Sequence, residues 1–363
     1  MRLIHAWHTL AFLGILLLLN MGSTFAATKD AVVPNVEMQW SIEETAGQNN
    51  IEAGSLLKAL AIEDTRANRL APLTAFSLSE EQVAAALRKA IALKNEESSK
   101  NWRLILLKFS LWWLFIAIGI RMLMRKWITP LRRKALLLLA VVVFGVLLGS
   151  DPSPMGTVKD TIVLYGVERV VFPPRLVAFG VFTLMVIVGN KMICGWGCQF
   201  GALQDLIGQL SPLKKKIRIP FKWSQRVRVA VFAAFTVIAF GFAFDVIGSI
   251  DPFKIYTPSH LTIFGGGAVL VLLLLSLITY RPWCTFACPF GLTGWFFERF
   301  SFYRIRWNSK KCIACGNCER VCPSQHMIGV LADERHPADC YSCGACIKAC
   351  PVDALRYDKK SEG

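Results

Sequence analysis

The sequence predicts an α-helical polytopic membrane protein that ends in a small α+β domain. Of its 363 residues, 54% are hydrophobic and 18% are charged, compared with about 45–50% and about 25% in ordinary globular chains. Five long apolar segments lie between residues 104 and 280, and two copies of one cysteine-rich motif follow them. This composition excludes an ordinary soluble enzyme, a disordered chain and a collagen-like chain.

Residues 1–26 have the pattern of a secretory signal peptide. A short basic start with Arg2 is followed by apolar residues 10–19 and by small residues that end at Ala26. This apolar stretch is much shorter than the roughly 20 residues that span a bilayer. We therefore expect cleavage after Ala26. Retention as an N-terminal anchor is the alternative, and both outcomes export the residues that follow.

Residues 27–102 are expected to form a small exported helical region. Residues 27–101 hold 11 acidic and 8 basic side chains, a net charge of −3, which leaves +19 for the rest of the chain. Ser79 and Gln82 have the spacing of a capping box at the start of a helix. The apolar stripe of that helix consists of Val83, Leu87 and Ile91. The region either docks an exported partner or packs only on itself.

Five apolar segments approach the length of a transmembrane helix. They are residues 104–122, 134–149, 173–192, 227–248 and 261–280. The predicted fold therefore has five transmembrane helices after a signal peptide, within a membrane domain that covers residues 103–308.

Loop charges orient these spans. The turn after the first span and the segment 191–226 are rich in Lys and Arg, whereas the loops at 150–170 and 249–260 together hold three basic residues. Short cytoplasmic loops carry the excess of Lys and Arg, so the basic segments are expected in the cytoplasm. The prediction is a multi-pass protein of the bacterial inner (cytoplasmic) membrane, with residues 27–102 periplasmic and the C-terminal domain cytoplasmic.

The membrane domain contains a tandem two-helix repeat. Each unit reads span, Asp-Pro loop, span and then a Cys-x3-Cys motif that is followed by Phe-Gly. The Asp-Pro pairs begin at Asp151 and Asp251, and the motifs begin at Cys194 and Cys284. Chance similarity between Leu-rich helices is the alternative, but it has to match all these positions together. We expect two units of the same orientation, each bringing a cysteine pair to the inner membrane face.

The strongest chemical signal lies in the C-terminal domain, residues 309–358. A Cys-x2-Cys-x2-Cys-x3-Cys-Pro run starts at Cys312 and recurs at Cys340. This run is typical of bacterial ferredoxins with two [4Fe-4S] clusters, in which the fourth cysteine ligates the other cluster. The predicted ligands are Cys312, Cys315, Cys318 and Cys350 for cluster 1, and Cys340, Cys343, Cys346 and Cys322 for cluster 2. Structural zinc and unligated thiols are the weaker alternatives, because two complete runs are present.

The four remaining cysteines are a less specific set. They are Cys194, Cys198, Cys284 and Cys288. Within each pair the spacing of four places both sulfurs on one face of a helix. If the repeat units pack around a pseudo-twofold axis, the four thiols converge and can hold a third iron–sulfur cluster. A thiol or disulfide switch and a purely structural role stay open. The nearby aromatic residues expected in the interfacial belt, with an electron path as the alternative, are Trp196, Trp283 and Phe286.

These motifs together resemble the NapH and NosR type of membrane polyferredoxin, with MauN-like proteins as close relatives. The resemblance covers about residues 104–355. It implies quinol-linked electron transfer between the quinone pool and a redox partner, commonly an exported reductase or its maturation system. Gln199 stands where the family usually has proline, whereas Pro289 keeps it, so the turn of the first motif is in question. The exported region is short and lacks the flavin-binding domain of larger NosR-type proteins, so no flavin is expected.

Other cofactors and catalytic groups have little support. The chain has five histidines and no Cys-x-x-Cys-His motif, which excludes c-type haem attachment. Asp245 is a weak candidate for a quinone or proton-path residue, because it is the one acidic residue well inside an apolar segment. Its position near the interface, where it can reach water, is the simpler explanation. Asp151, Asp251 and His260 are weaker candidates at the same face.

The sequence therefore predicts a membrane-bound iron–sulfur electron transfer protein that exchanges electrons with the quinone pool and a redox protein partner. Whether it is a quinol dehydrogenase subunit stays open. The alternative is a non-catalytic maturation or regulatory factor for a periplasmic oxidoreductase. A third possibility is a membrane subunit that oxidises a soluble low-potential donor. The basic residues Lys214, Lys215 and Lys216 are expected to contact membrane lipid headgroups, and no nucleic-acid partner is expected.

Overall fold

The computed structural model describes residues 34–213, 216–334 and 336–359. The expected signal peptide, residues 1–26, lies outside these described residues. The chain divides into two compact units, one that ends at Asn95 and one that begins at Glu96. The predicted membrane and ferredoxin domains therefore belong to the same unit.

The first unit is a small helical bundle. Its elements are α2 (Ile42–Gln48), α3 (Ala53–Ala59), α4 (Arg66–Leu70), the 3-10 helix η2 (Leu73–Phe76) and most of α5 (Glu80–Ser98). The predicted capping box is present, since the Ser79 N–H donates to Gln82 Oε1 at 2.9 Å and the Gln82 N–H donates to Ser79 Oγ at 3.2 Å. Val83 and Leu87 are buried in the bundle core and Ile91 packs against it. The predicted amphipathic helix is thus confirmed.

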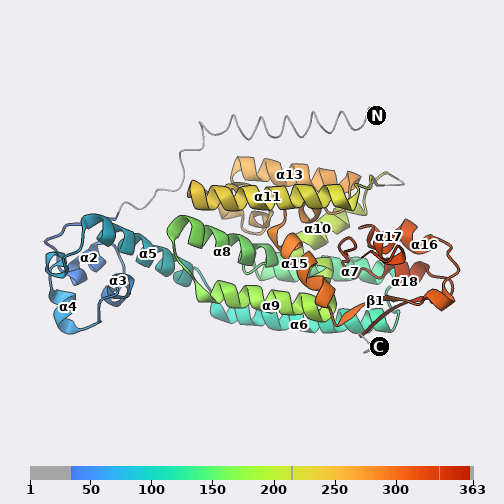
Figure 1. Ribbon diagram of the computed structural model, residues 1–363, viewed down its shortest axis with the longest axis horizontal. Coiled ribbons are helices and arrows are strands. Elements are labelled where there is room, and N and C mark those ends of the chain that lie inside the picture. Colours follow the sequence, from blue (N-terminus) through green and yellow to red (C-terminus); the bar gives the residue numbers. More distant parts are fainter. Residues whose placement is uncertain (1–33, 214–215, 335, 360–363) are drawn as a thin grey trace. The chain divides into compact units, whose positions relative to one another are not determined.

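The second unit is built from long helices with short helical segments between them (Figure 1). In its first half they are α6 (Trp102–Met124), α7 (Pro130–Ala140), the π-helix η3 (Val141–Leu147), α8 (Pro154–Glu168), α9 (Pro173–Gly189), the π-helix η4 (Ile193–Gly197) and α10 (Gln199–Gly208). The second half has α11 (Phe221–Gly241), α12 (Val246–Ser249), the 3-10 helices η5 (Pro252–Tyr256) and η6 (Pro258–His260), α13 (Ile263–Ile278), α14 (Pro282–Phe286), α15 (Pro289–Phe297) and the 3-10 helix η7 (Glu298–Phe300).

Each of the five predicted spans contains a helix, but the helices differ in length. Among the described residues, α6 and α11 are long and apolar enough to cross a membrane, whereas the apolar helices α9 and α13 are shorter. The remaining span is shared between α7 and η3. The helical architecture is therefore confirmed, and five membrane crossings stay a prediction.

Residues 150–170 differ from the expected exported loop. They contain α8, which packs against α9, α11 and α15. The helix begins where Ser153 Oγ accepts the Gly156 N–H at 2.9 Å and Pro154 takes the first helical position, an arrangement that favours helix initiation. Lys159, one of the few basic residues in this expected loop, is buried and pairs with Asp251 at 2.8 Å.

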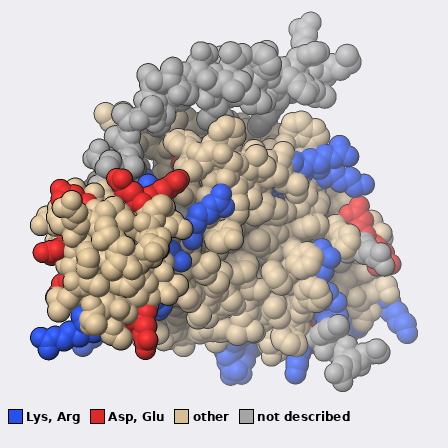
Figure 2. All heavy atoms as spheres, turned by 60° about the vertical axis from the view of Figure 1, so that its left-hand side comes forward, with Lys and Arg blue, Asp and Glu red and all other residues tan. Residues whose placement is uncertain are grey.

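The outward faces of the long helices are apolar. Exposed examples are Leu106 and Leu114 on α6, Val177 on α9, Val237 on α11 and Leu270 on α13. On the face shown in Figure 2, wide areas carry neither basic nor acidic side chains. Such large apolar surfaces are unusual for a soluble monomer and mark a membrane or protein interface.

The C-terminal domain is α+β, as predicted. Its strands β1 (Tyr303–Trp307) and β2 (Leu355–Lys359) form an antiparallel pair in which Ile305 faces Tyr357. Between the strands lie the 3-10 helix η8 (Ser309–Lys311), α16 (Asn317–Val321), α17 (His326–Leu331) and α18 (Ala345–Ala349). The sheet contacts α6 and α9, and the Tyr357 hydroxyl donates to the Gly189 carbonyl at 2.9 Å. The domain is therefore joined to the helices by buried contacts.

Candidate iron–sulfur sites

The first set of ferredoxin cysteines surrounds one cavity of about 240 Å³. Its thiols belong to Cys312, Cys315, Cys318 and Cys350. Cys312 and Cys315 come from the loop before α16, Cys318 lies in the first turn of that helix, and Cys350 follows α18. Trp307, Leu331 and Leu355 add apolar walls. The structure therefore brings together three cysteines of one run and the last cysteine of the other, which is the grouping predicted for cluster 1.

The second set is Cys322, Cys340, Cys343 and Cys346. The Cys343 thiol lies close enough to each of the other three thiols to interact with it electrostatically. Burial raises the pKa of Cys322, Cys340 and Cys346 above the ordinary thiol value. Without a metal these thiols are therefore neutral, and ligation is what favours the thiolate form.

Both ferredoxin runs use the same backbone turn. Gly316 precedes α16 with φ of 68°, and Gly344 precedes α18 with φ of 76°. Residues other than glycine rarely adopt this left-handed conformation. A β-carbon on Gly344 would also lie 2.7 Å from Leu123 Cδ2 on α6. The two glycines thus shape the cysteine loops, and the second also permits close packing against the helices.

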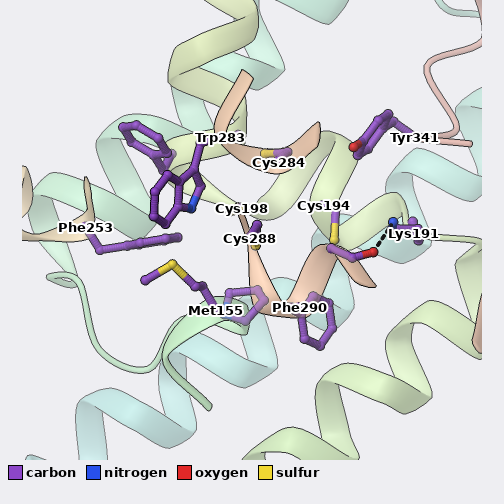
Figure 3. Close-up of a pocket in the computed structure, with 14 residues that line it drawn as sticks. Met155, Lys191, Cys194, Cys198, Phe253, Trp283, Cys284, Cys288, Phe290 and Tyr341 are labelled. Atoms are coloured by element: carbon purple, nitrogen blue, oxygen red, sulfur yellow. Dashed lines mark hydrogen bonds between the residues drawn. The ribbon is translucent and has the colours of Figure 1, made fainter. Parts of the chain in front are cut away.

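A further cavity, here called the four-cysteine cavity, lies between the two repeat units (Figure 3). Its lining includes Cys194, Cys198, Cys284 and Cys288. The first pair comes from η4 and the start of α10, and the second from α14 and the start of α15. The two Cys-x3-Cys motifs therefore meet in space, although their cysteines are far apart in sequence.

Gln199 preserves the turn that the family's proline usually occupies. Cys198 has φ −71° and ψ 115°, and Cys288 has φ −67° and ψ 117°. Gln199 and Pro289 are the first residues of α10 and α15, respectively. The side-chain amide of Gln199 also donates from Nε2 to the Ser150 carbonyl at 3.3 Å, a bond that proline cannot make. The motifs differ before this turn, where η4 is π-helical and α14 is α-helical.

The segments that follow both Asp-Pro pairs also reach the four-cysteine cavity. Pro154, Met155 and Phe253 line it. The sequence predicts these segments in loops at the membrane face opposite the cysteines. Their position beside the cysteines differs from that expectation. It arises because α8 and η5 begin inside the unit, next to the motifs.

The aromatic belt predicted for Trp196 and Trp283 is wrong, because both side chains are buried. Trp196 Nε1 donates to the Ser342 carbonyl at 2.9 Å, and Trp283 lines the four-cysteine cavity. Phe286 is half-buried. The two tryptophans therefore belong to the interior around the site.

Buried basic side chains support the Cys-x3-Cys motifs. Arg281 donates to the Cys194 carbonyl at 2.6 Å and to the Gly195 carbonyl at 2.8 Å. Lys191 Nζ donates to the Gly291 carbonyl at 3.0 Å. Both side chains are fully buried, and positive charge next to thiolates favours their ionised form. Sequence reasoning missed this role, although Lys191 and Arg281 both stand three residues before the first cysteine of a motif.

Two buried carboxylates balance these cations. Asp205 pairs with Arg281 at 2.9 Å and with Arg133 at 2.5 Å. Asp339 pairs with Lys191 and, at 3.0 Å, with Arg228. Burial alone would raise the pKa of each carboxyl, but the paired cations hold both pKa values below the usual range. Both groups are therefore ionised at neutral pH.

The acidic candidates near the Asp-Pro loops have structural partners. Asp245 is not inside a helix, because α11 ends at Gly241, and its carboxylate caps α12 by accepting the Gly248 N–H at 2.7 Å. Asp151 pairs with Arg175 at 2.8 Å, and Asp251 pairs with Lys159. His260 is exposed in η6. The three carboxylates therefore have structural partners in the fold, and a catalytic role for any of the four residues stays a prediction.

The cysteine sets are not shaped for a single metal ion. Among the residues described by the structure, no group of three or more His, Cys, Asp or Glu side chains could hold one metal ion. A tetrahedral zinc site needs its sulfurs about 2.3 Å from one point. No set of cysteines among the described residues meets this requirement.

Two family models match the chain. The 4Fe-4S dicluster domain matches residues 304–351, and the 4Fe-4S binding domain matches twice, at residues 171–220 and 261–309. The double match covers both Cys-x3-Cys motifs. It bears out the tandem repeat and supports iron–sulfur binding by the chain.

Curated relatives of this chain include two ferredoxin-type proteins and a regulatory protein. The methylamine utilization ferredoxin-type protein MauN of Methylobacillus flagellatus is 29% identical over 147 residues, 39% of this chain and 50% of MauN. The ferredoxin-type protein NapH of Escherichia coli is 28% identical over 165 residues, 42% of this chain and 55% of NapH. The regulatory protein NosR of Stutzerimonas stutzeri is 27% identical over 180 residues, 45% of this chain and 24% of NosR.

The matched part spans about half the length of MauN and NapH and a smaller share of NosR. No solved structure matches the chain. Together the relatives and the family models confirm the resemblance to ferredoxin-type proteins that the cysteine motifs predict.

Proposed function

We propose that this chain, a ferredoxin-type protein of the NapH, NosR and MauN type, is a membrane-bound electron transfer protein with three iron–sulfur clusters. It passes electrons between the quinone pool and a redox partner such as an exported reductase. The observation that carries the proposal is the grouping of all twelve cysteines into three sets of four. A chain with scattered structural thiols has no reason to divide its cysteines in this way.

The ligands of the three clusters follow from this grouping. The two ferredoxin sets are proposed to hold one [4Fe-4S] cluster each, and the four-cysteine cavity a third iron–sulfur cluster. When bound, each cluster supplies one-electron redox chemistry. The chain provides the thiolates, the apolar walls that exclude water, and the buried cations Lys191 and Arg281 that offset negative charge.

The membrane assignment rests on the apolar outward faces of α6, α9, α11 and α13. A bilayer is the environment in which such faces are stable. The excess of Lys and Arg in the segments between these helices favours a cytoplasmic location for those segments. We place five crossings in the bacterial inner membrane, the exported region 27–102 in the periplasm and the C-terminal domain in the cytoplasm.

The quinone is proposed to react near the four-cysteine cavity. A quinol at the outer face would lie roughly 30 Å of hydrocarbon from cytoplasmic clusters. Pro154 and Phe253, which follow the Asp-Pro pairs, line the same cavity as the cysteines. This arrangement brings the segments that follow the Asp-Pro pairs, proposed for the outer side, next to the first metal ligands.

A maturation or regulatory role is the second candidate. The name of the NosR relative, a regulatory protein, favours it. In that role the clusters support a periplasmic oxidoreductase without turning over quinol. The two functions differ in whether quinol reduces the clusters at a catalytic rate.

Anaerobically purified, membrane-extracted protein tests these alternatives. A quinol analogue is mixed with the oxidised protein, and cluster reduction is followed by absorbance bleaching and by electron paramagnetic resonance. Reduction at a rate compatible with turnover supports quinol-linked electron transfer. Clusters that stay oxidised favour the regulatory role, and reduction by a low-potential soluble donor alone indicates the opposite direction of flow.

Iron analysis of two matched variants tests the third cluster. Wild-type protein is expected to contain about twelve iron atoms per chain if it has three four-iron clusters. Cys284→Ser is expected to lose about four of them while the spectrum of the ferredoxin clusters stays unchanged. Cys312→Ser is the matched variant, because it changes a ferredoxin ligand and spares the four-cysteine cavity. About eight iron atoms in the wild type would remove the third cluster from the proposal.

A further inference from the structure

Two polar atoms in the lining of the four-cysteine cavity have no hydrogen-bond partner among the described residues. They are the hydroxyl of Tyr341 and Nε1 of Trp283. Tyr341 is 4% exposed and Trp283 is 3% exposed. Buried polar groups nearly always have a partner, because an unpaired one loses its bonds to water without compensation. Two such atoms in one cavity therefore point to an acceptor that the protein itself does not supply.

Both donors are directed at the cysteines. In Figure 3 the hydroxyl of Tyr341 points toward Cys284, and the indole nitrogen of Trp283 points toward the thiols of Cys198 and Cys288. The Cys284 thiol also lies close enough to the Tyr341 hydroxyl to interact with it electrostatically.

The two cations that lie over the Tyr341 ring, of which Lys191 also lines the cavity, do not offer an acceptor. The Lys191 ammonium lies 5.4 Å from the centre of the Tyr341 ring. The Arg281 guanidinium lies 5.0 Å from the same point, and neither group can accept a hydrogen bond. The other side chains that line the cavity are apolar or thiols. Sulfur is thus the acceptor chemistry that fits both donors.

We propose that Tyr341 and Trp283 donate hydrogen bonds to sulfur atoms of an iron–sulfur cluster in the four-cysteine cavity and raise its reduction potential. Hydrogen bonds to thiolate or sulfide stabilise the more negative, reduced state and are a principal means by which proteins adjust cluster potentials. This inference rests on the proposed third cluster and deepens it, because it names the residues that set the potential.

Tyr341 makes the site depend on the ferredoxin domain. It lies between Cys340 and Cys343, two proposed ligands of cluster 2. A β-carbon on Gly195 would lie 2.0 Å from the Tyr341 carbonyl oxygen, so the Cys340–Cys343 segment packs directly on the first motif. The Ser342 hydroxyl donates to the Asn190 carbonyl at 2.8 Å. One donor of the four-cysteine cavity is therefore delivered by the docked C-terminal domain.

Tyr341→Phe and Trp283→Phe test the inference in the full-length protein. Each variant removes one donor and keeps an aromatic ring in the cavity. The reduction potential of the third cluster is measured by a redox titration monitored by electron paramagnetic resonance. Each variant is expected to lower the ratio of reduced to oxidised cluster about tenfold at a fixed potential, which for one electron is about 59 mV.

Tyr357→Phe is the matched control. Tyr357 is buried at the same interface, but its hydroxyl already donates to the Gly189 carbonyl at 2.9 Å, so the potential is expected to stay unchanged. About twelve iron atoms together with an unmoved potential in Tyr341→Phe and Trp283→Phe would overturn this inference alone. About eight iron atoms in the wild type would overturn the third cluster and this inference together. If Trp283→Phe does not fold, Tyr341→Phe carries the test.

Discussion

At the scale of single residues, buried charge controls the surroundings of the four-cysteine cavity. Arg281 and Asp205 form a buried ion pair, and Arg281 also bonds the Cys194 carbonyl. Burying an ion pair costs desolvation energy, so its presence is weak evidence for extra stability. Removing one partner is different, because it leaves an uncompensated charge in the interior. Asp205 is therefore a residue at which the electrostatic argument can be tested.

Asp205→Asn is expected to destabilise the protein by about 3–5 kcal/mol at neutral pH. The pKa of Asp205 is lowered in the folded state, so its stabilising effect is present above the unfolded pKa of about 3.9 and is lost as the pH falls through the folded pKa. The measurement is the thermal unfolding midpoint between pH 7 and pH 3.

The difference between wild type and Asp205→Asn should shrink as the pH falls. Asp333→Asn is the control, because Asp333 is exposed, and its midpoint should follow the wild type throughout. A difference between wild type and Asp205→Asn that stays constant down to pH 3 would contradict the electrostatic explanation.

At the scale of elements, glycines set how closely the motif helices approach their neighbours. A β-carbon on Gly201 would lie 3.0 Å from the Cys194 carbonyl oxygen, and one on Gly291 would lie 2.8 Å from the Cys284 carbonyl oxygen. The Phe-Gly positions of the repeat are thus explained by packing. Gly195 is tighter still, because a β-carbon there would lie 2.0 Å from the Tyr341 carbonyl oxygen of the C-terminal domain.

Gly195→Ala is expected to loosen the C-terminal domain from the helices. The added methyl group would overlap the Tyr341 backbone, and overpacking of this kind typically costs about 1–3 kcal/mol. Limited proteolysis and amide hydrogen exchange of residues 303–359 measure the effect. Gly180→Ala in α9 is the matched control, because nothing lies within 4 Å of its added β-carbon. Equal protection of this domain in both variants would refute the packing argument.

At the scale of the whole molecule, apolar helix faces and the charge distribution favour a membrane protein with two different sides. Residues 27–101, which include the first unit, carry a net negative charge, whereas the net positive charge lies in the rest of the chain. The C-terminal cysteines, proposed to carry oxygen-sensitive clusters, are expected in the reducing cytoplasm. We therefore expect a membrane-impermeant label to reach the two units from opposite sides of the membrane.

Glu52→Cys and Asp333→Cys test this orientation as a pair of exposed positions. A membrane-impermeant maleimide is expected to label Glu52→Cys in intact spheroplasts and Asp333→Cys after lysis alone. The wild-type chain, which keeps its native cysteines, gives the background. Labelling of Asp333→Cys before lysis would place the ferredoxin domain outside and would contradict the proposed electron path.

Local pattern made several features predictable from the sequence. The capping box at Ser79 depends on residues three apart, and the helices in the apolar segments depend on periodicity and length. The grouping of Cys312 with Cys350 follows from the spacing within two adjacent runs, and the cavity that they line agrees with it. The 4Fe-4S binding model that matches both Cys-x3-Cys regions bears out the repeat. Each of these features can be predicted because it depends on a short stretch of sequence or on a repeat of that stretch.

The tertiary structure alone decided which surroundings the cysteines have. Lys191 reads as a loop charge and Trp283 as an interfacial residue, yet both are buried beside the four-cysteine cavity. Tyr341 reaches that cavity from the C-terminal domain, and α8 fills a segment expected as a loop. The physical reason is that burial and direction of a side chain depend on contacts between segments far apart in sequence. Spacing and hydrophobic period carry no information about those contacts.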